Sequence, residues 1–256
     1  MKKLITIWGV FLVAFLSQSA IAAGYALFDA TTDNISVIGD SVIGTAATIE
    51  ARVNVVNIDS TGGNIFSEWS DGREDKDLSI VPDQTIYGYL FHPGGFTPLI
   101  SSATVSLNTW HHLAYVYDGS EERLYLDGLK VGSRTASGDV LDSSYRAVTA
   151  VGAILKGSKI EMSFLGLLDT LRFSTIARYT GDSFTAPTGD LTSDAYTNLL
   201  YNFNEPQNST VVYDLSGNGR DGYLGSGFSG ATSPTLIPEP ATLLLLGLGA
   251  VILRRK

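Results

Sequence analysis

Short alternating runs of apolar and polar residues dominate the chain between its two ends. Examples are the runs at residues 47–53, 85–91 and 112–117, which are bounded by turn-forming pairs such as Asp-Gly, Gly-Gly or Ser-Gly. An apolar residue at every second position directs one face of a strand to a core and the other to solvent. No segment of helical length between the ends keeps an apolar period near 3.6. The pattern therefore predicts an all-β fold, and strands at this spacing indicate a sandwich or a barrel.

The clearest unit in this pattern is a predicted pair of hairpins at residues 110–131. Asp118-Gly119 turns the chain after the first strand, and Asp127-Gly128 separates two later apolar runs. An Asp-Gly pair between alternating runs is the strongest short signal for a hairpin. Consecutive strand residues point to opposite faces, so His111 and His112 cannot both serve one site, and we interpret both as structural.

Further stretches accompany these hairpins in a fixed order. Beside Trp110-His111-His112-Leu113-Ala114 and the strand that ends in Asp-Gly stand the runs 27–37, 48–53 and 164–173. In this order they resemble the LamG-like family, whose fold is a concanavalin A-type jelly roll. The resemblance covers most of residues 24–225 and implies a two-sheet antiparallel jelly-roll sandwich. Arg52 departs from the family pattern, in which Trp is common, and Asp169 is a family-type acidic position.

Residues 199–204 and 214–222 resemble a segment that often opens domains of this family, but here they come last. We expect them to form a strand and a loop that close the same sandwich. A permuted or truncated second domain is the alternative, although little chain remains to build one.

The start of the chain has the pattern of a secretory signal peptide. Lys2 and Lys3 precede an apolar stretch at 4–16 and a small-x-small sequence that ends at Ala22, after which we expect cleavage. The predicted organisation is a signal peptide at 1–22, a β-sandwich at 23–225, a flexible linker rich in Gly, Ser and Thr at 226–236, and a separate tail at 237–256.

The tail contains an apolar run of thirteen residues at 241–253, between Pro238-Glu239-Pro240 and the basic residues Arg254, Arg255 and Lys256. A helix of this length rises about 20 Å, whereas the hydrocarbon layer of a bilayer is about 30 Å thick. The run can therefore enter a membrane as a short transmembrane helix, but it is short for a permanent span. Three cations at its end favour a cytoplasmic C-terminus, with the rest of the chain outside.

Pro-Glu-Pro, a short Leu-rich helix and a terminal basic cluster together resemble the PEP-CTERM sorting signal of Gram-negative bacteria. The resemblance implies handling by an exosortase, a membrane-embedded cysteine transpeptidase-like enzyme, often alongside exopolysaccharide production. Pro238, Glu239 and Pro240 would then be the processing motif, and Arg254, Arg255 and Lys256 the basic stop. The implied route is export by the secretion machinery, an intermediate anchored in the inner membrane, and then the cell surface or extracellular matrix. An ordinary short anchor is the alternative.

Composition narrows the functions that the body can have. With both ends left out, it carries 12 basic and 25 acidic residues, a net charge of −13. Such a surface repels nucleic acid and anionic lipid. The sequence contains no cysteine, which excludes disulfides and zinc–thiolate sites.

An acidic exported domain can hold calcium, and one loop has part of the required pattern. Asp214, Ser216 and Asn218 offer oxygen atoms at alternate positions, and Asp221 adds a carboxylate. Gly225 stands where a helix-loop-helix calcium site needs its bidentate Glu, so the loop is not that motif. The pattern predicts either a calcium site at Asp214, Asn218 and Asp221 or a tight turn whose side chains bond the local backbone.

The sequence gives little sign of catalysis. Retaining glucanases need two carboxylates about 5 Å apart on one face, and the Glu-x-Asp-x-x-Glu run typical of this fold does not occur. Charged residues gather at 68–77, but Gly72 and the density of charge predict a solvated loop there. We therefore expect no enzymatic activity.

Aromatic residues can stack on sugar rings, although they also fill sandwich cores. The candidates in or beside loop-rich sequence are Trp69, Tyr87, Tyr89, Phe91 and Phe96. The sequence thus predicts an exported surface or matrix protein whose non-catalytic sandwich binds carbohydrate or protein, with exopolysaccharide among the expected partners. A polysaccharide hydrolase of the same fold and a purely structural biofilm-matrix protein are the alternatives.

Overall fold

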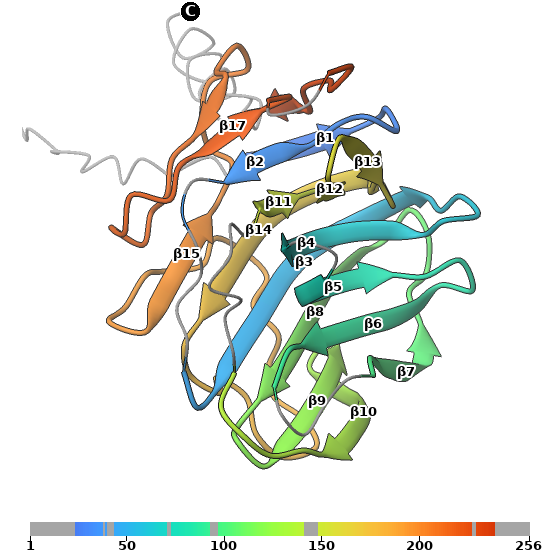
Figure 1. Ribbon diagram of the computed structural model, residues 1–256, viewed down its shortest axis with the longest axis vertical. Coiled ribbons are helices and arrows are strands. Elements are labelled where there is room, and N and C mark those ends of the chain that lie inside the picture. Colours follow the sequence, from blue (N-terminus) through green and yellow to red (C-terminus); the bar gives the residue numbers. More distant parts are fainter. Residues whose placement is uncertain are drawn as a thin grey trace, which may run out of the picture.

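A computed structural model describes residues 24–37, 39, 44–70, 73–92, 97–140, 148–226 and 229–238. The expected signal peptide and the expected transmembrane helix lie outside these residues. The described chain forms antiparallel strands in two main sheets, whose arrangement is visible in Figure 1. Within it, no helix has the length and apolar character that crossing a membrane requires.

The first layer, here called the β3 sheet, has the strand order β10-β9-β8-β3-β14-β1-β18. β15 pairs with the far end of β14, so β1 and β15 share one edge of that long strand. The strands of this sheet are β1 (Tyr25–Phe28), β3 (Ala47–Asn57), β8 (Trp110–Tyr117), β9 (Glu121–Leu126), β10 (Leu129–Thr135), β14 (Leu165–Ser174), β15 (Thr197–Tyr201) and β18 (Thr235–Ile237).

The second layer, here called the β4 sheet, has the order β16-β17-β2-β11-β4-β5-β6-β7. A small hairpin of β12 and β13 packs against β4. The strands of the second layer and of the hairpin are β2 (Ile35–Val37), β4 (Gly63–Ser70), β5 (Arg73–Ile80), β6 (Thr85–Leu90), β7 (Leu99–Thr104), β11 (Val148–Val151), β12 (Ile154–Lys156), β13 (Lys159–Glu161), β16 (Val211–Val212) and β17 (Gly222–Leu224).

Alternate residues of the strands fill one core between the two sheets. Ala51 and Val53 of β3 and Leu113 and Tyr115 of β8 are fully buried in it. Gly88 of β6 lies against the Tyr115 ring, where an added Cβ would come within 2.6 Å of a ring carbon. The residues between those of the core point outwards, and they decide what each sheet presents to its surroundings.

The predicted strands and hairpins are confirmed. The alternating runs at 47–53 and 112–117 lie in β3 and β8, and the run at 85–91 lies in β6 except for its last residue. Asp127 and Gly128 have φ values of 51° and 80° and join β9 to β10, as a two-residue turn with positive φ at both positions requires. The fold is the predicted all-β, two-sheet antiparallel sandwich.

The predicted solvated loop at 68–77 is wrong. β4 and β5 occupy most of this stretch, and Glu68, Lys76 and Asp77 are buried. Glu68 and Lys76 are cross-strand partners and form an ion pair. Asp77 accepts a hydrogen bond from Asn64, 2.6 Å away. These charges find partners only after the strands have paired, which the density of charge along the sequence does not show.

The predicted flexible linker at 226–236 is wrong in its last part. Thr235–Ile237 form β18, which pairs with β1, and Leu236 is fully buried in the core. The Thr232 hydroxyl donates a hydrogen bond of 2.6 Å to Asp33. A three-residue edge strand preceded by Gly, Ser, Thr and Pro has the composition of a linker, so the sequence carried only a weak signal for it.

Residues 197–224 complete both sheets, as expected for a single sandwich. β15 pairs with β14 in the β3 sheet, whereas β17 pairs with β2 in the β4 sheet. In Figure 1 the orange strand β17 lies beside the blue strand β2, whereas the orange strand β15 lies beside β14. This segment is therefore part of the sandwich and not a second domain.

Candidate functional site

The outer face of the β3 sheet has two unlike halves. Glu50, Arg52 and Asn54 of β3 point to this face because the residues between them point into the core. Residues 175–196, here called the covering segment, pack on one half through Tyr179 and Phe184. The other half keeps part of its side chains in solvent.

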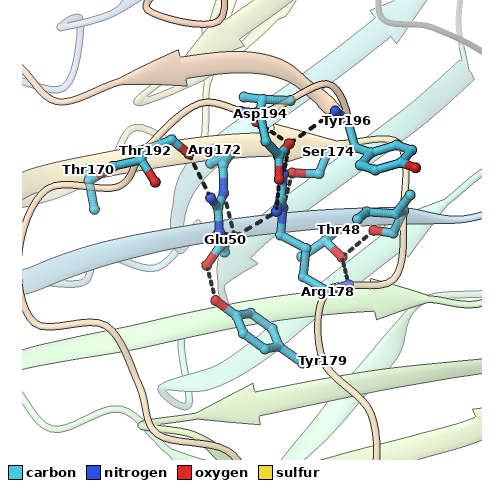
Figure 2. A network of polar contacts seen from close by, with 12 residues as sticks. Thr48, Glu50, Thr170, Arg172, Ser174, Arg178, Tyr179, Thr192, Asp194 and Tyr196 are labelled. Atoms are coloured by element: carbon cyan, nitrogen blue, oxygen red, sulfur yellow. Dashed lines mark hydrogen bonds and ion pairs between the residues drawn. The ribbon is translucent and has the colours of Figure 1, made fainter.

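Glu50 is the centre of the covered half. Its Oε1 accepts hydrogen bonds from Nε and Nη2 of Arg172, at 2.8 and 2.6 Å. Its Oε2 accepts one from the Tyr179 hydroxyl at 2.6 Å and lies 3.1 Å from Nε2 of His112. Figure 2 shows Arg172 of β14 and Tyr179 of the covering segment approaching Glu50 of β3 from opposite sides. Three strands and the covering segment therefore meet at one buried carboxylate.

Electrostatics keep this carboxylate ionised. Burial raises the pKa of Glu50, but the hydrogen bond with His112 and the positive charge of Arg172 outweigh it, so the pKa lies below its ordinary value. Burial and the neighbouring Glu50 charge raise the pKa of the Tyr179 hydroxyl. Because its neighbours hold Glu50 as an anion, the arrangement anchors the covering segment and does not suit a group that must exchange protons.

A second ion pair joins two residues within the covering segment, Arg178 and Asp194. Nη1 and Nη2 of Arg178 donate to the two carboxylate oxygens of Asp194, at 2.9 and 2.8 Å. The hydrogen bonds from Arg178 hold the pKa of Asp194 well below its ordinary value. This two-point pairing fixes the orientation of both groups, as Figure 2 shows.

The open half carries an aromatic and ionic surface, here called the Trp110 patch and defined by Tyr25, Arg52, Trp110 and Asp169. The Arg52 guanidinium lies 4.5 Å from the centre of the Trp110 ring, and the Tyr25 ring meets Trp110 edge-on at 6.2 Å. Nη1 of Arg52 lies 2.5 Å from Oδ2 of Asp169. Tyr25 and Trp110 are half-buried, and 24% of the Arg52 side chain is exposed.

Four strands of the β3 sheet build this patch, and a bulge directs one of its members. The pairing of β14 with β3 shifts register between Leu168 and Thr170, and Asp169 is the extra residue. A bulge of this kind re-aims a side chain, which here reaches Arg52. Asn54 lies across from Trp110, and its buried Oδ1 has no hydrogen-bond partner in the described part of the chain.

The Trp110 patch combines an apolar ring with a polar group that reaches solvent. The Trp110 ring offers a broad apolar surface and the Arg52 guanidinium offers N–H donors, whereas the Asp169 side chain, which is 4% exposed, holds Arg52 in place beside the ring. The ligand that matches this set has an apolar face and a polar edge. A pyranose ring has both.

In the predicted calcium loop, the side chains of Asp214, Asn218 and Asp221 already form hydrogen bonds within the protein. Oδ1 of Asp214 accepts from the backbone N–H groups of Leu200 and Ser216, and Oδ2 accepts from the Ser216 hydroxyl. Asn218 donates to Ser216 and to the backbone, and Asp221 accepts from the Asp214 N–H. These are the hydrogen bonds that a locally bonded turn makes. Within the described residues no group of three or more His, Cys, Asp or Glu is placed to hold a metal, and calcium here stays a prediction.

The aromatic candidates from the sequence lie on the β4 sheet or just beyond it. Lys156 of β12 lies 4.3 Å above the ring of half-buried Trp69. Tyr89 and Phe91 are buried, and Tyr87 is half-buried. Phe96 lies outside the described residues. The structure does not bring the four described residues, Trp69, Tyr87, Tyr89 and Phe91, to the Trp110 patch.

Of the predicted processing motif Pro238-Glu239-Pro240, the structure describes Pro238 alone. Pro238 is exposed and follows β18 directly. Glu239, Pro240 and the basic residues Arg254, Arg255 and Lys256 lie outside the described part.

The sequence did not single out the Trp110 patch, although it held one signal for it. Arg52 stands where the family often has Trp, and a charged residue in an apolar strand needs a partner. The partner, Asp169, is 117 residues away along the chain. Tyr25 is equally remote from Trp110, so local alternation could not join them.

A cleft at one end of the sandwich is a weaker candidate. It has a volume of 590 Å³, and no aromatic residue is among those that line it. Its hydroxyl groups have partners already, since Ser163 donates to the Thr31 carbonyl and Thr61 to Asp59. The Trp110 patch therefore remains the better binding surface.

The two antiparallel sheets define a jelly-roll sandwich. Residues 29–182 match the family model of the concanavalin A-like lectin/glucanases superfamily, and the chain belongs to this superfamily. Residues 236–256 match the PEP-CTERM protein-sorting motif, which indicates an exported protein. No curated protein sequence matches the chain.

Several solved structures are similar to the chain to different degrees. A Bacteroides ovatus protein to which carbohydrate binding has been ascribed aligns with 86% of this chain at 19% identity and a TM-score of 0.66, and this chain spans 61% of its length. The SAP-like pentraxin of Limulus polyphemus aligns with 62% of this chain and 79% of its own, at 16% identity and a TM-score of 0.49. Domains LG4-5 of the mouse laminin α1 chain align with 66% of this chain and 48% of their own, at 16% identity and 0.48.

Proposed function

We propose that this protein is an exported, non-catalytic module that binds a glycan through the Trp110 patch. The observation that carries the proposal is the half-exposed Trp110 ring with the Arg52–Asp169 ion pair beside it. The C–H face of a sugar stacks on such a ring, while its hydroxyls accept hydrogen bonds from the guanidinium, which Asp169 holds in place. The similar fold of the B. ovatus protein, to which carbohydrate binding is ascribed, supports this assignment.

The burial and the hydrogen bonds of the carboxylates support a non-catalytic role. Hydrolysis of a glycosidic bond needs two carboxyl groups that reach the substrate from a groove. Asp75 and Asp77 share one face of β5, but both are buried, and Asp77 accepts hydrogen bonds from Asn64 and Ser79. Glu50 is fully bonded beneath the covering segment.

The test of glycan binding uses the protein purified after export, with calcium supplied, on an array of bacterial polysaccharides. We expect Trp110→Ala to weaken binding at least about tenfold, because a central aromatic anchor contributes more than 1.4 kcal/mol. Trp110→Phe keeps a ring and should retain most of the affinity. Tyr213→Ala removes an exposed aromatic residue away from the patch and serves as the control. A blank array with folded protein would favour the purely structural matrix protein instead.

We propose further that the tail is processed by an exosortase, which places the body at the cell surface or in the exopolysaccharide matrix after an inner-membrane intermediate. Replacement of Pro238, Glu239 and Pro240 by alanine should leave export intact and block processing. Intact mass and cell fractionation check this. An unchanged mass and location of the mature protein would count against the exosortase.

A further inference from the structure

The folded body ends where the sorting motif begins. The match to the motif starts at residue 236, whereas β18 extends to Ile237 and Pro238 follows at once. The first residues of the motif are therefore part of the β3 sheet. A flexible spacer between body and tail, which the composition had predicted, is not what precedes Pro238.

β18 is held to the body by both backbone and side chains. It pairs with β1 in a register that sets Tyr25 opposite Ile237 and Leu27 opposite Thr235. Leu236 is fully buried and belongs to the main core. Just before the strand, the Thr232 N–H donates to the Thr32 carbonyl at 3.0 Å. The segment is thus fixed on both sides of Leu236.

This attachment conflicts with what a processing enzyme requires. An extended chain spans about 3.3 to 3.6 Å per residue, so Glu239 can lie only about 7 Å beyond Ile237. Enzymes that recognise a peptide bind it as an extended segment that includes residues on both sides of the reactive bond. The residues on the N-terminal side of this motif are those paired with β1.

We propose that β18 must separate from β1 before the tail can be processed, so that docking of β18 limits the rate of processing. The inference rests on the exosortase part of the proposed function. Processing breaks one peptide bond on the C-terminal side of β18. The acyl group of the body passes to water or to an amine acceptor, and the tail leaves with a new amino terminus. β18 remains with the body and can pair with β1 again.

The test compares the rate of processing among three forms of the full-length protein in the producing cell, by pulse labelling and mass. Leu236→Ala weakens the burial of β18 and should speed processing about tenfold or more. A Gly-Ser insertion of about eight residues between Ile237 and Pro238 adds about 15 Å of reach. It should also speed processing while leaving β18 docked. The unchanged chain should be the slowest of the three.

Leu113→Ala is the matched control, because Leu113 is equally buried but lies on β8, away from β18. It destabilises the body without loosening β18, so processing should keep the rate of the unchanged chain as long as circular dichroism shows folded protein. Equal rates for the unchanged chain, Leu236→Ala and the insertion would overturn the inference. A mass that never changes in any form, including the unchanged chain, would instead overturn the proposed exosortase step.

Discussion

The role of each buried charge in this sandwich depends on its partners from distant parts of the chain. Glu50 is neutralised by Arg172, which is 122 residues away, and is also bonded by Tyr179 of the covering segment. Arg52 pairs with Asp169 in the same way, but at the edge of solvent. The first pair anchors the covering segment to the β3 sheet, whereas the second belongs to the surface at which we propose that a glycan binds.

Loss of the Glu50 charge should destabilise the fold strongly. Glu50→Gln leaves the Arg172 guanidinium buried without its counter-charge, which costs about 3 kcal/mol of unfolding free energy. Urea denaturation at neutral pH measures the change. Glu161→Gln makes the same replacement at a half-buried position of β13 and should have little effect. Equal midpoints for Glu50→Gln and the unchanged protein would show that the network does not stabilise the fold.

Acid should lower the stability of the fold, because the carboxyl groups of Glu50 and Asp118 have lowered pKa values in the folded protein. The pKa of Glu50 lies below its ordinary value of 4.5, and that of Asp118 falls from 3.8 to about 2, because bonds from Ser120 and Arg123 outweigh burial. Unfolded chains therefore bind protons more readily, and the stability that these groups contribute is present above about pH 4.5 and lost as the pH falls towards 2. Unfolding free energies at several pH values should show this decline, with a smaller slope for Glu50→Gln.

At the scale of elements, close contacts fix how the two sheets pack. β6 crosses β8 where Gly88 meets the Tyr115 ring. The covering segment is fixed by bonds as well as by packing, since the Phe184 N–H donates to the Gly128 carbonyl at the β9–β10 turn. Elements that are far apart in sequence are therefore positioned by a few specific contacts.

A methyl group at Gly88 should test the spacing between the sheets. In Gly88→Ala the new Cβ would lie 2.6 Å from Tyr115, and overpacking of this kind costs about 1 to 3 kcal/mol. Gly189→Ala is the control, because an added Cβ there meets open space. Thermal unfolding should show a lower midpoint for the first variant alone. A midpoint shared by both would mean that the sheets can move apart at no cost.

At the scale of the whole molecule, the sandwich extends beyond the part that defines its family. The family model matches residues 29–182, but β15, β17 and β18 continue both sheets after that point. Tyr201 and Phe203, which follow the matched region, are fully buried in the core. The folding unit is therefore longer than the region that the family model matches.

Truncation should reveal the true boundary of the body. A recombinant chain of residues 24–238 should be monomeric and give a β-type circular dichroism spectrum. One of residues 24–182 would expose the edges of β14, β1 and β2 and should aggregate, because unpaired edges recruit other strands. Size-exclusion chromatography distinguishes the two results. A monomeric, folded 24–182 chain would place the boundary at the end of the family match instead.

The sequence by itself determined the class of fold, the hairpin at Asp127-Gly128 and the tail motif. Each of these depends on local order: a two-residue period, a turn pair, or a run of adjacent residues. The tertiary structure alone decided that β4 and β5 occupy most of the stretch 68–77, because the Glu68 and Lys76 charges cancel only across paired strands. It also decided how the Trp110 patch is built and how β18 docks, since both join residues that lie far apart along the chain. Periodicity identifies strands and their faces, but side-chain partners from distant strands are set only when the sheets assemble.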